Sequence, residues 1–222
     1  MRRSIMPGMR PNCIFPYTIN YFDVVGKTCC ALLAVFILSS CASNTVNEDV
    51  KSNASTNFVI RDDVPVRVEI LADFDKAVKL LQEKDYERGI RLLNRVSERS
   101  EKSIAPYINL GIAYRITGEM KLAESSLNKA LAINPIHPAA NNEMGIVYRK
   151  TGRFAEARRI YERILERFTS YMPARKNLGI LCDLYINDLS CAMANYEIYI
   201  KADPGDKNVA MWIADLRIRM GN

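Results

Sequence analysis

From residue 66 to residue 204, apolar side chains recur three or four positions apart, which is the spacing of one face of an α-helix. Short polar or glycine-containing segments interrupt this pattern at regular intervals. Segments of that kind mark turns between helices. The sequence therefore predicts an all-α fold in which a series of amphipathic helices is joined by short turns.

The helical pattern repeats every 34 residues. Small residues mark the period at four positions, Ala77, Gly111, Gly145 and Gly179. A small residue on a helix allows a second helix to approach closely, and self-similarity at such a period is typical of stacked helix pairs. We predict four helix pairs, at about 70–103, 104–137, 138–171 and 172–204, and a capping helix within 205–222.

The residues around the small position extend the repeat. The second copy contains Tyr107, Leu110, Gly111, Tyr114, Gly118, Ala123, Leu127, Ala130 and Pro135. The third copy contains Met144, Gly145, Tyr148, Gly152, Ala157, Tyr161 and Ile164, and the fourth Leu178, Gly179, Ala192, Tyr196 and Tyr199. Over roughly residues 66–204 this pattern resembles the tetratricopeptide repeat (TPR) family. The resemblance implies a solenoid that binds other proteins and carries no catalytic site.

The turns of the predicted hairpins show one irregularity. Gly118 and Gly152 stand where first helices end, and we expect both in the left-handed conformation. In the fourth copy Ala192 comes one place late, so the first helix or the turn at 186–188 holds an extra residue. Glycine is absent there, and we expect Asn187 to take the left-handed conformation.

The segment after Pro204 predicts the capping helix. Val209, Trp212, Ile213 and Leu216 share one face, and most charged residues lie off it. We expect this helix to cover the last repeat and to present a polar outer end, with Trp212 as a packed core residue.

The N-terminal region indicates where the protein works. Residues 1–40 hold four basic residues and one acidic residue, and the stretch 28–40 is uncharged and too short to span a bilayer. It ends Leu-Ser-Ser-Cys, which resembles the bacterial lipobox, whose cysteine is acylated, for instance with palmitate. The resemblance makes 1–40 a lipoprotein signal peptide and Cys41 the lipidated residue. An ordinary cleaved signal is the alternative.

The residues after Cys41 refine this reading. Ala42 follows the cysteine where inner-membrane lipoproteins commonly have aspartate, so the resemblance implies an outer-membrane location facing the periplasm. Residues 41–65 are rich in Ser, Asn, Thr, Asp and Glu and predict a flexible tether.

Charge and histidine content argue against several functions. The chain has 31 basic and 25 acidic residues, a net charge of +6, and without residues 1–40 the counts fall to 27 and 24, or +3. A balance this even does not indicate nucleic-acid binding. The single histidine, His137, lies in a predicted loop, which leaves no partner for histidine-based catalysis or metal binding. We expect no enzymatic activity, no cofactor and no metal.

Two cysteines, Cys182 and Cys191, remain after Cys41, on either side of the irregular turn. On an antiparallel hairpin such positions come within disulfide reach, and the periplasm is oxidising. We favour a Cys182–Cys191 disulfide, with two buried free thiols as the alternative.

The TPR resemblance places the residue after each small position on the inner surface. Here that set is apolar: Val78, Ile112, Ile146 and Ile180. Beside it the sequence places Ile108 and Ile116 and the cations Arg115, Arg149, Lys150 and Lys176. We predict that these ten residues form a groove that receives a helix or peptide of a partner protein. In the alternative, the isoleucines pack between first helices and the cations are solvated. A clamp for a C-terminal carboxylate is not predicted, because Ile112 and Ile146 stand where that clamp has asparagine.

Two functions fit these predictions. The first is a periplasm-facing TPR lipoprotein that assists assembly of an envelope complex, as type IV pilus pilotins do for secretins, or that accompanies a TonB-type system. The second is an adaptor that docks and regulates peptidoglycan enzymes. The sequence does not choose between them.

Overall fold

The computed structural model describes residues 67–221, and the predicted signal peptide (1–40), Cys41 and the tether (41–65) lie outside this part. Within it the chain is helical and contains no strand. The elements are α1 (Val68–Gln82), α2 (Tyr86–Arg99), α3 (Ala105–Thr117), α4 (Met120–Ile133), α5 (Pro138–Lys150), α6 (Phe154–Arg167), α7 (Met172–Leu181), the π-helix η1 (Cys182–Ile186), α8 (Leu189–Ala202) and α9 (Lys207–Arg219). None of these described helices is both long and apolar enough to cross a bilayer.

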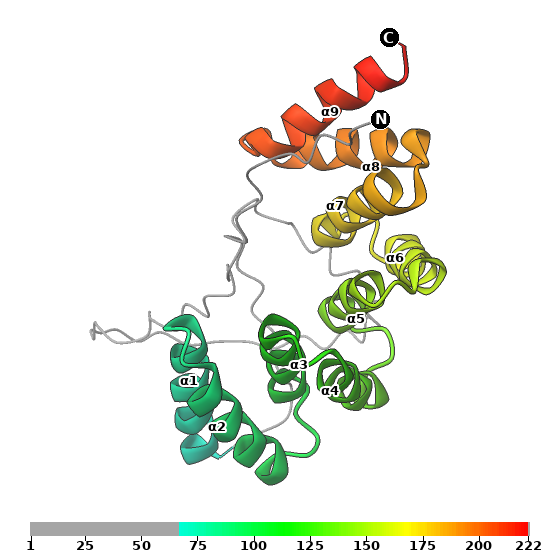
Figure 1. Ribbon diagram of the computed structural model, residues 1–222. Coiled ribbons are helices and arrows are strands. Elements are labelled where there is room, and N and C mark those ends of the chain that lie inside the picture. The colour runs from blue at the N-terminus through cyan, green and yellow to red at the C-terminus, as the bar shows by residue number, and fades with distance from the viewer. Residues whose placement is uncertain (1–66, 222) are drawn as a thin grey trace, which may run out of the picture. The chain divides into compact units, whose positions relative to one another are not determined.

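The helices pack as four successive hairpins, α1–α2, α3–α4, α5–α6 and α7–α8, followed by α9 (Figure 1). Each second helix also packs against the first helix of the next pair. First helices contact one another, α1 with α3, α3 with α5 and α5 with α7, whereas second helices of the described part share no comparable contacts. The first helices therefore form one continuous row, and the prediction of an all-α, TPR-like solenoid is confirmed for these residues.

The small residues of the 34-residue period lie where two helices of a hairpin touch. A β-carbon added at Gly145 would lie 2.5 Å from the ring of Tyr161, far inside van der Waals contact. The same holds for the corresponding pairs in two other hairpins (Gly111 with Leu127, Gly179 with Tyr196). Glycine is needed here because it lets the large side chain of the second helix reach the backbone of the first.

The turns within the hairpins require left-handed backbone. Gly118 has a φ of 91° and Gly152 a φ of 79°, as predicted, and an added β-carbon would meet nothing within 4 Å at either position. The requirement there is therefore conformational and not steric. In the first hairpin the corresponding residue is Lys84, which adopts a φ of 65° although it is not glycine.

The extra residue of the fourth repeat is absorbed by η1. The helix widens from Cys182 to Ile186 and ends at Asn187, whose φ of 59° is left-handed. The backbone N–H of Asp188 donates to the Cys182 carbonyl at 2.9 Å and closes the turn. Both parts of the prediction for this turn, the extra residue and the role of Asn187, are confirmed.

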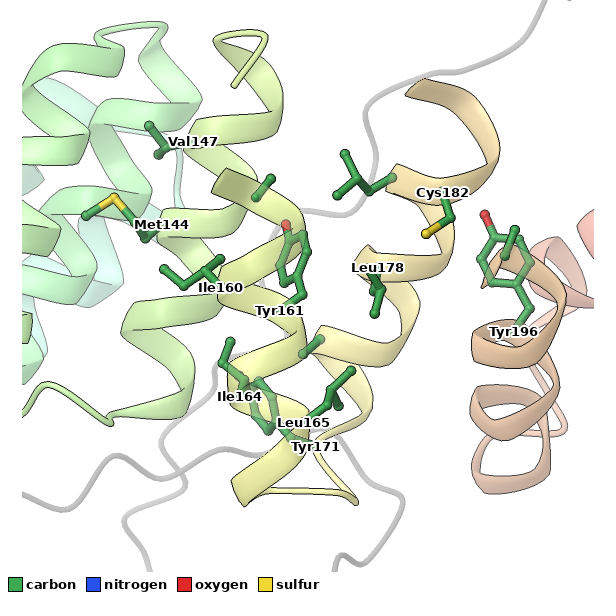
Figure 2. Close-up of a cluster of buried hydrophobic side chains, with 14 of the residues drawn as sticks. Met144, Val147, Ile160, Tyr161, Ile164, Leu165, Tyr171, Leu178, Cys182 and Tyr196 are labelled. Carbon is green, nitrogen blue, oxygen red and sulfur yellow. The ribbon is translucent and has the colours of Figure 1, made fainter. Parts of the chain in front are cut away.

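Large apolar side chains from both rows fill the space between hairpins (Figure 2). The fully buried ones in this region include Met144, Val147, Tyr161, Leu181, Tyr196, Val209 and Leu216. Each large side chain of this kind contributes about 2 kcal/mol of favourable transfer free energy. The core therefore runs through the stack from hairpin to hairpin and has no single centre.

Helix α9 closes this core. Val209, Ile213 and Leu216 are buried, and Trp212 is half-buried with its ring 5.4 Å from that of Tyr196. The prediction of packing on the last repeat is confirmed. The predicted polar outer end is wrong in part, because Met211 and Ile218 of α9 are 62% and 77% exposed.

Candidate functional site

The ten predicted groove residues all lie on first helices. They come from α1 (Val78), α3 (Ile108, Ile112, Arg115, Ile116), α5 (Ile146, Arg149, Lys150) and α7 (Lys176, Ile180). Because these helices contact one another in order, residues 34 positions apart lie at equivalent places along one row. Their exposure, however, divides them into two groups.

The first group is buried. Ile108 is 1% exposed and Ile112 is 5% exposed, so neither offers a surface to a partner. Helix α3 packs against α1, α2, α4 and α5, and this packing covers both side chains. The groove prediction is wrong for these two residues, and the alternative, packing between first helices, describes them.

The second group retains accessible surface. Val78, Ile116, Ile146 and Ile180 are half-buried, and Lys150 is exposed. Ile146 and Ile180 occupy the same repeat position on the neighbouring helices α5 and α7. Each first helix thus keeps one half-buried apolar residue of the predicted set, and on α5 and α7 the two stand at the same repeat position.

Two of the predicted cations are paired within the protein. The Nε of Arg115 donates to Oε2 of the buried Glu143 at 2.9 Å, which links α3 to α5. The Nζ of Lys176 donates to Oδ2 of Asp206 at 2.5 Å and lies over the Tyr199 ring. The prediction that these two cations face a partner is therefore wrong, because each neutralises an internal carboxylate.

The pairing with Lys176 affects the pKa of Asp206. Burial by itself would raise the pKa of Asp206, but the hydrogen bond from Lys176, the backbone N–H of Val209 and the positive charge outweigh burial. The pKa of Asp206 therefore lies below its ordinary value of 3.8. The carboxylate also caps α9, since it accepts from the N–H groups of Asn208 and Val209.

Arg149 differs from Arg115 and Lys176. No carboxylate of the described residues lies within ion-pairing distance of its guanidinium, whose carbon lies 5.5 Å from the centre of the Tyr185 ring. Its Nε and the hydroxyl of Tyr161 are both buried, and neither makes a hydrogen bond of normal geometry. Burial raises the pKa of Tyr161, and the charge of Arg149 opposes that rise.

The sequence did not predict the role of Tyr185. This side chain is 44% exposed at the end of η1, and its ring lies 5.1 Å from that of Phe154. In the regular repeats the first helix ends at this point, at Thr117 in α3 and at the cap Thr151 after α5, and neither residue is aromatic. The late Ala192 was the only available signal, because the extra residue extends the first helix and carries Tyr185 beside Arg149.

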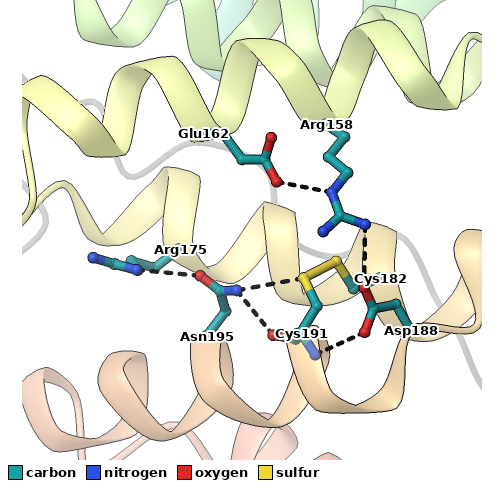
Figure 3. Close-up of a disulfide and its surroundings, with 7 residues drawn as sticks. All are labelled: Arg158, Glu162, Arg175, Cys182, Asp188, Cys191 and Asn195. Atoms are coloured by element: carbon teal, nitrogen blue, oxygen red, sulfur yellow. Dashed lines mark hydrogen bonds and ion pairs between the residues drawn. A yellow bond between two sulfur atoms is a disulfide. The ribbon is translucent and has the colours of Figure 1, made fainter.

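The irregular turn is closed by a disulfide between Cys182 and Cys191, whose Cα atoms lie 5.9 Å apart (Figure 3). Asp188 caps α8 by accepting from the Cys191 N–H at 3.0 Å, and Arg158 of α6 donates to the same carboxylate at 3.1 Å. The Cys191 N–H contributes most to lowering the pKa of Asp188. This bonding fixes the end of η1, and with it Tyr185, against the neighbouring hairpin.

The same three residues, Cys182, Asp188 and Cys191, form the one cluster in the described part with metal-ligand spacing. The two sulfur atoms are bonded to each other, which leaves no thiolate for a metal ion. His137 has a structural contact instead, since its Nδ1 accepts from the Ala140 N–H at 3.4 Å at the start of α5.

The comparisons with known proteins agree with this fold. Residues 115–178 match the family model of the tetratricopeptide repeat. The structure of PilF from Pseudomonas aeruginosa superposes with a TM-score of 0.63 at 21% identity, over 68% of each chain. At this identity the likeness shows the fold alone, and TPR folds are generally scaffolds for protein interaction.

Two curated relatives match shorter segments. The probable UDP-N-acetylglucosamine–peptide N-acetylglucosaminyltransferase SPINDLY of Solanum lycopersicum is 33% identical over 93 residues, 42% of this chain and 10% of the relative. The photosystem I assembly protein Ycf3 of Synechococcus is 36% identical over 72 residues, 32% of this chain and 39% of the relative. The chain thus spans about a tenth of the length of the first curated relatives it matches.

Proposed function

We propose that this protein is a non-catalytic scaffold that binds partner proteins at the first-helix surface, which we define as Ile146, Arg149, Lys150, Ile180 and Tyr185. One observation carries the proposal. These residues leave apolar, aromatic and cationic side chains accessible at the C-terminal part of the row, whereas Ile108 and Ile112 are buried. Aromatic residues and arginine are enriched where proteins bind each other tightly.

We further propose that the protein acts at the bacterial outer membrane, anchored by lipid on Cys41 and facing the periplasm. The lipobox-like Leu-Ser-Ser-Cys and the following Ala42 support this location. In this setting the scaffold assists assembly of an envelope complex, a pilus or secretin system or a TonB-type system. The resemblance to pilotin-type TPR lipoproteins and the match to a relative named as an assembly protein support that role.

The test compares two variants by crosslinking in intact cells. Ile146→Asp combined with Ile180→Asp places two carboxylates on the first-helix surface. Ile198→Asp is the control, because Ile198 is 39% exposed on the second helix α8. We expect the double variant to lose the crosslinked partners and the control to keep them, with equal helical content by circular dichroism. If the folded double variant keeps every partner, binding does not occur at this surface.

A further inference from the structure

The described first helices and α9 contain five arginines: Arg115, Arg149, Arg175, Arg217 and Arg219. Arg115 donates to Glu143 at 2.9 Å, and Arg219 of α9 donates to Asp183 at 2.6 Å. Arg149 lies between these pairs along the row and has no carboxylate partner among the described residues. Arg217 pairs with Glu197, and Arg175 donates to the Thr169 carbonyl and to Oδ1 of Asn195. Three of the five charges are thus paired with carboxylates, whereas Arg149 has no carboxylate within ion-pairing distance in the described part.

The setting of Arg149 is prepared for an acceptor. Tyr185 supports its guanidinium from one side, and a guanidinium held against an aromatic ring is pre-organised for a planar partner. The buried Nε of Arg149 lies beside the buried hydroxyl of Tyr161, so this end of the guanidinium is held inside the fold. Arg149 as a whole is only half-buried, so the side chain stays accessible to a ligand with acceptor oxygens.

The surroundings specify what kind of acceptor fits. Carboxylate oxygens match the fork of a guanidinium and form charge-assisted hydrogen bonds. The neighbouring Phe154, Tyr185, Ile146 and Ile180 are apolar or aromatic, and low polarity strengthens an ion pair formed among them. The exposed Lys150 adds positive charge at the end of α5. The ligand is thus a carboxylate next to bulky apolar groups.

We propose that Arg149 binds the side-chain carboxylate of an aspartate or glutamate within a partner chain, with an apolar residue of that chain next to it on Tyr185. This inference rests on the proposed function and names the chemistry of its partner. The half-buried Ile146 precedes Arg149 on α5, and the half-buried Ile180 holds the same repeat position on α7. A partner chain that covers both isoleucines extends beyond Arg149, and for this reason we assign the carboxylate to an internal side chain.

The experiment selects binders from a random peptide library in which every peptide has an amidated C-terminus, with the full-length chain as bait. We expect the selected peptides to share an aspartate or glutamate beside an apolar residue. Replacing that acid by its amide in the best peptide should weaken binding by about tenfold or more. The Arg149→Gln variant should bind the acidic peptide more weakly than the wild type does, by the same factor as the acid-to-amide change. It should bind the amide peptide no worse than the wild type does.

Two further variants control for charge and geometry. Arg149→Lys keeps the charge without the planar fork and should give intermediate affinity. Arg159→Gln removes an exposed arginine from α6 and should change nothing.

The possible failures separate the two proposals. If the selected peptides show no preference for acids, or if the acid-to-amide change weakens binding equally in wild type and Arg149→Gln, the carboxylate inference is overturned and the proposed surface stands. If the wild-type chain selects no peptide at all, both are overturned.

Discussion

Arg219 of α9 donates a hydrogen bond to Asp183 of η1 at 2.6 Å and so joins the last helix to the irregular end of the fourth repeat. The side chain of Asp183 is buried, and the bond from Arg219 is the largest cause of the raised pKa of that arginine. The contact holds α9 against the same segment that carries Tyr185. The last helix and the first-helix surface therefore depend on each other.

Removing this contact should destabilise the C-terminal end. Arg219→Ala leaves a buried carboxylate without its partner, and because Arg219 is partly exposed we expect a loss of about 1–2 kcal/mol in the free energy of unfolding. Arg217→Ala is the matched control, since its pair with Glu197 is exposed and 3.6 Å long, and it should cost less than about 0.5 kcal/mol. Urea denaturation measures both. Equal losses in the two variants would mean that the Asp183 contact has no special role.

The glycines of the period should respond according to their surroundings. Gly145→Ala forces a β-carbon against Tyr161 and should cost about 1–3 kcal/mol through overpacking. Gly118→Ala meets no atom, so only its left-handed backbone opposes the change, at about 1 kcal/mol. Adding Tyr161→Leu to Gly145→Ala should recover only part of the stability that Gly145→Ala loses. Thermal unfolding measures both variants. A Gly145→Ala variant as stable as wild type would contradict the close packing seen here.

The hairpins and regular turns were predictable because they depend on short-range chemistry. The 34-residue period fixed the partners of Gly111, Gly145 and Gly179, and left-handed turns require residues such as Gly118, Gly152 or Asn187. Lys84 was missed because nothing near it in the sequence marks a left-handed residue. Its conformation is imposed by the packing of α1 on α2.

The candidate site was harder to predict because exposure depends on neighbouring repeats. Ile112 and Ile146 stand at the same repeat position, yet only Ile112 is buried. Lys176 finds its counter-ion in Asp206, which is 30 residues away and belongs to the capping segment. Contacts of this range follow from the stacking of particular hairpins and leave no local pattern in the sequence.

Acid should weaken the contact between Asp206 and Lys176. The pKa of Asp206 lies below 3.8 in the folded protein, so the charged carboxylate stabilises the fold at pH values above 3.8. This stabilisation should disappear as the pH falls below about 4 and through the lowered pKa. Asp206→Asn keeps an acceptor for the helix cap but loses the charge, so it should be less stable at neutral pH and approach wild type in acid. A constant difference from pH 7 to pH 2 in chemical denaturation would exclude this role of the charge.

The disulfide should stabilise the fourth hairpin. Cys182 and Cys191 are 9 residues apart, and closing a loop of this size contributes about 2–3 kcal/mol. Reducing agent should lower the melting temperature of wild type and leave the Cys182→Ala, Cys191→Ala double variant unchanged. Mass spectrometry of protein taken from the periplasm should find both sulfur atoms bonded, and two free thiols there would refute the pairing in cells.

The proposed anchor has a direct test. Cys41→Ala removes the acylated residue, and we expect the protein to leave the membrane fraction and appear with soluble periplasmic proteins. Ser40→Ala is a suitable control, because it keeps the cysteine and should stay with outer membranes on a density gradient. Unchanged sedimentation of Cys41→Ala would show that something other than this lipid holds the protein.

Binding of partner proteins at the first-helix surface can be measured with a photocrosslinking amino acid placed at single positions in living cells. Positions 180 and 185 report on the proposed surface, and position 198 on the second helix α8 reports on the opposite row. We expect discrete crosslinked products with envelope proteins from positions 180 and 185 and none from position 198. Products from position 198 alone, or no products from any position, would contradict binding at this surface.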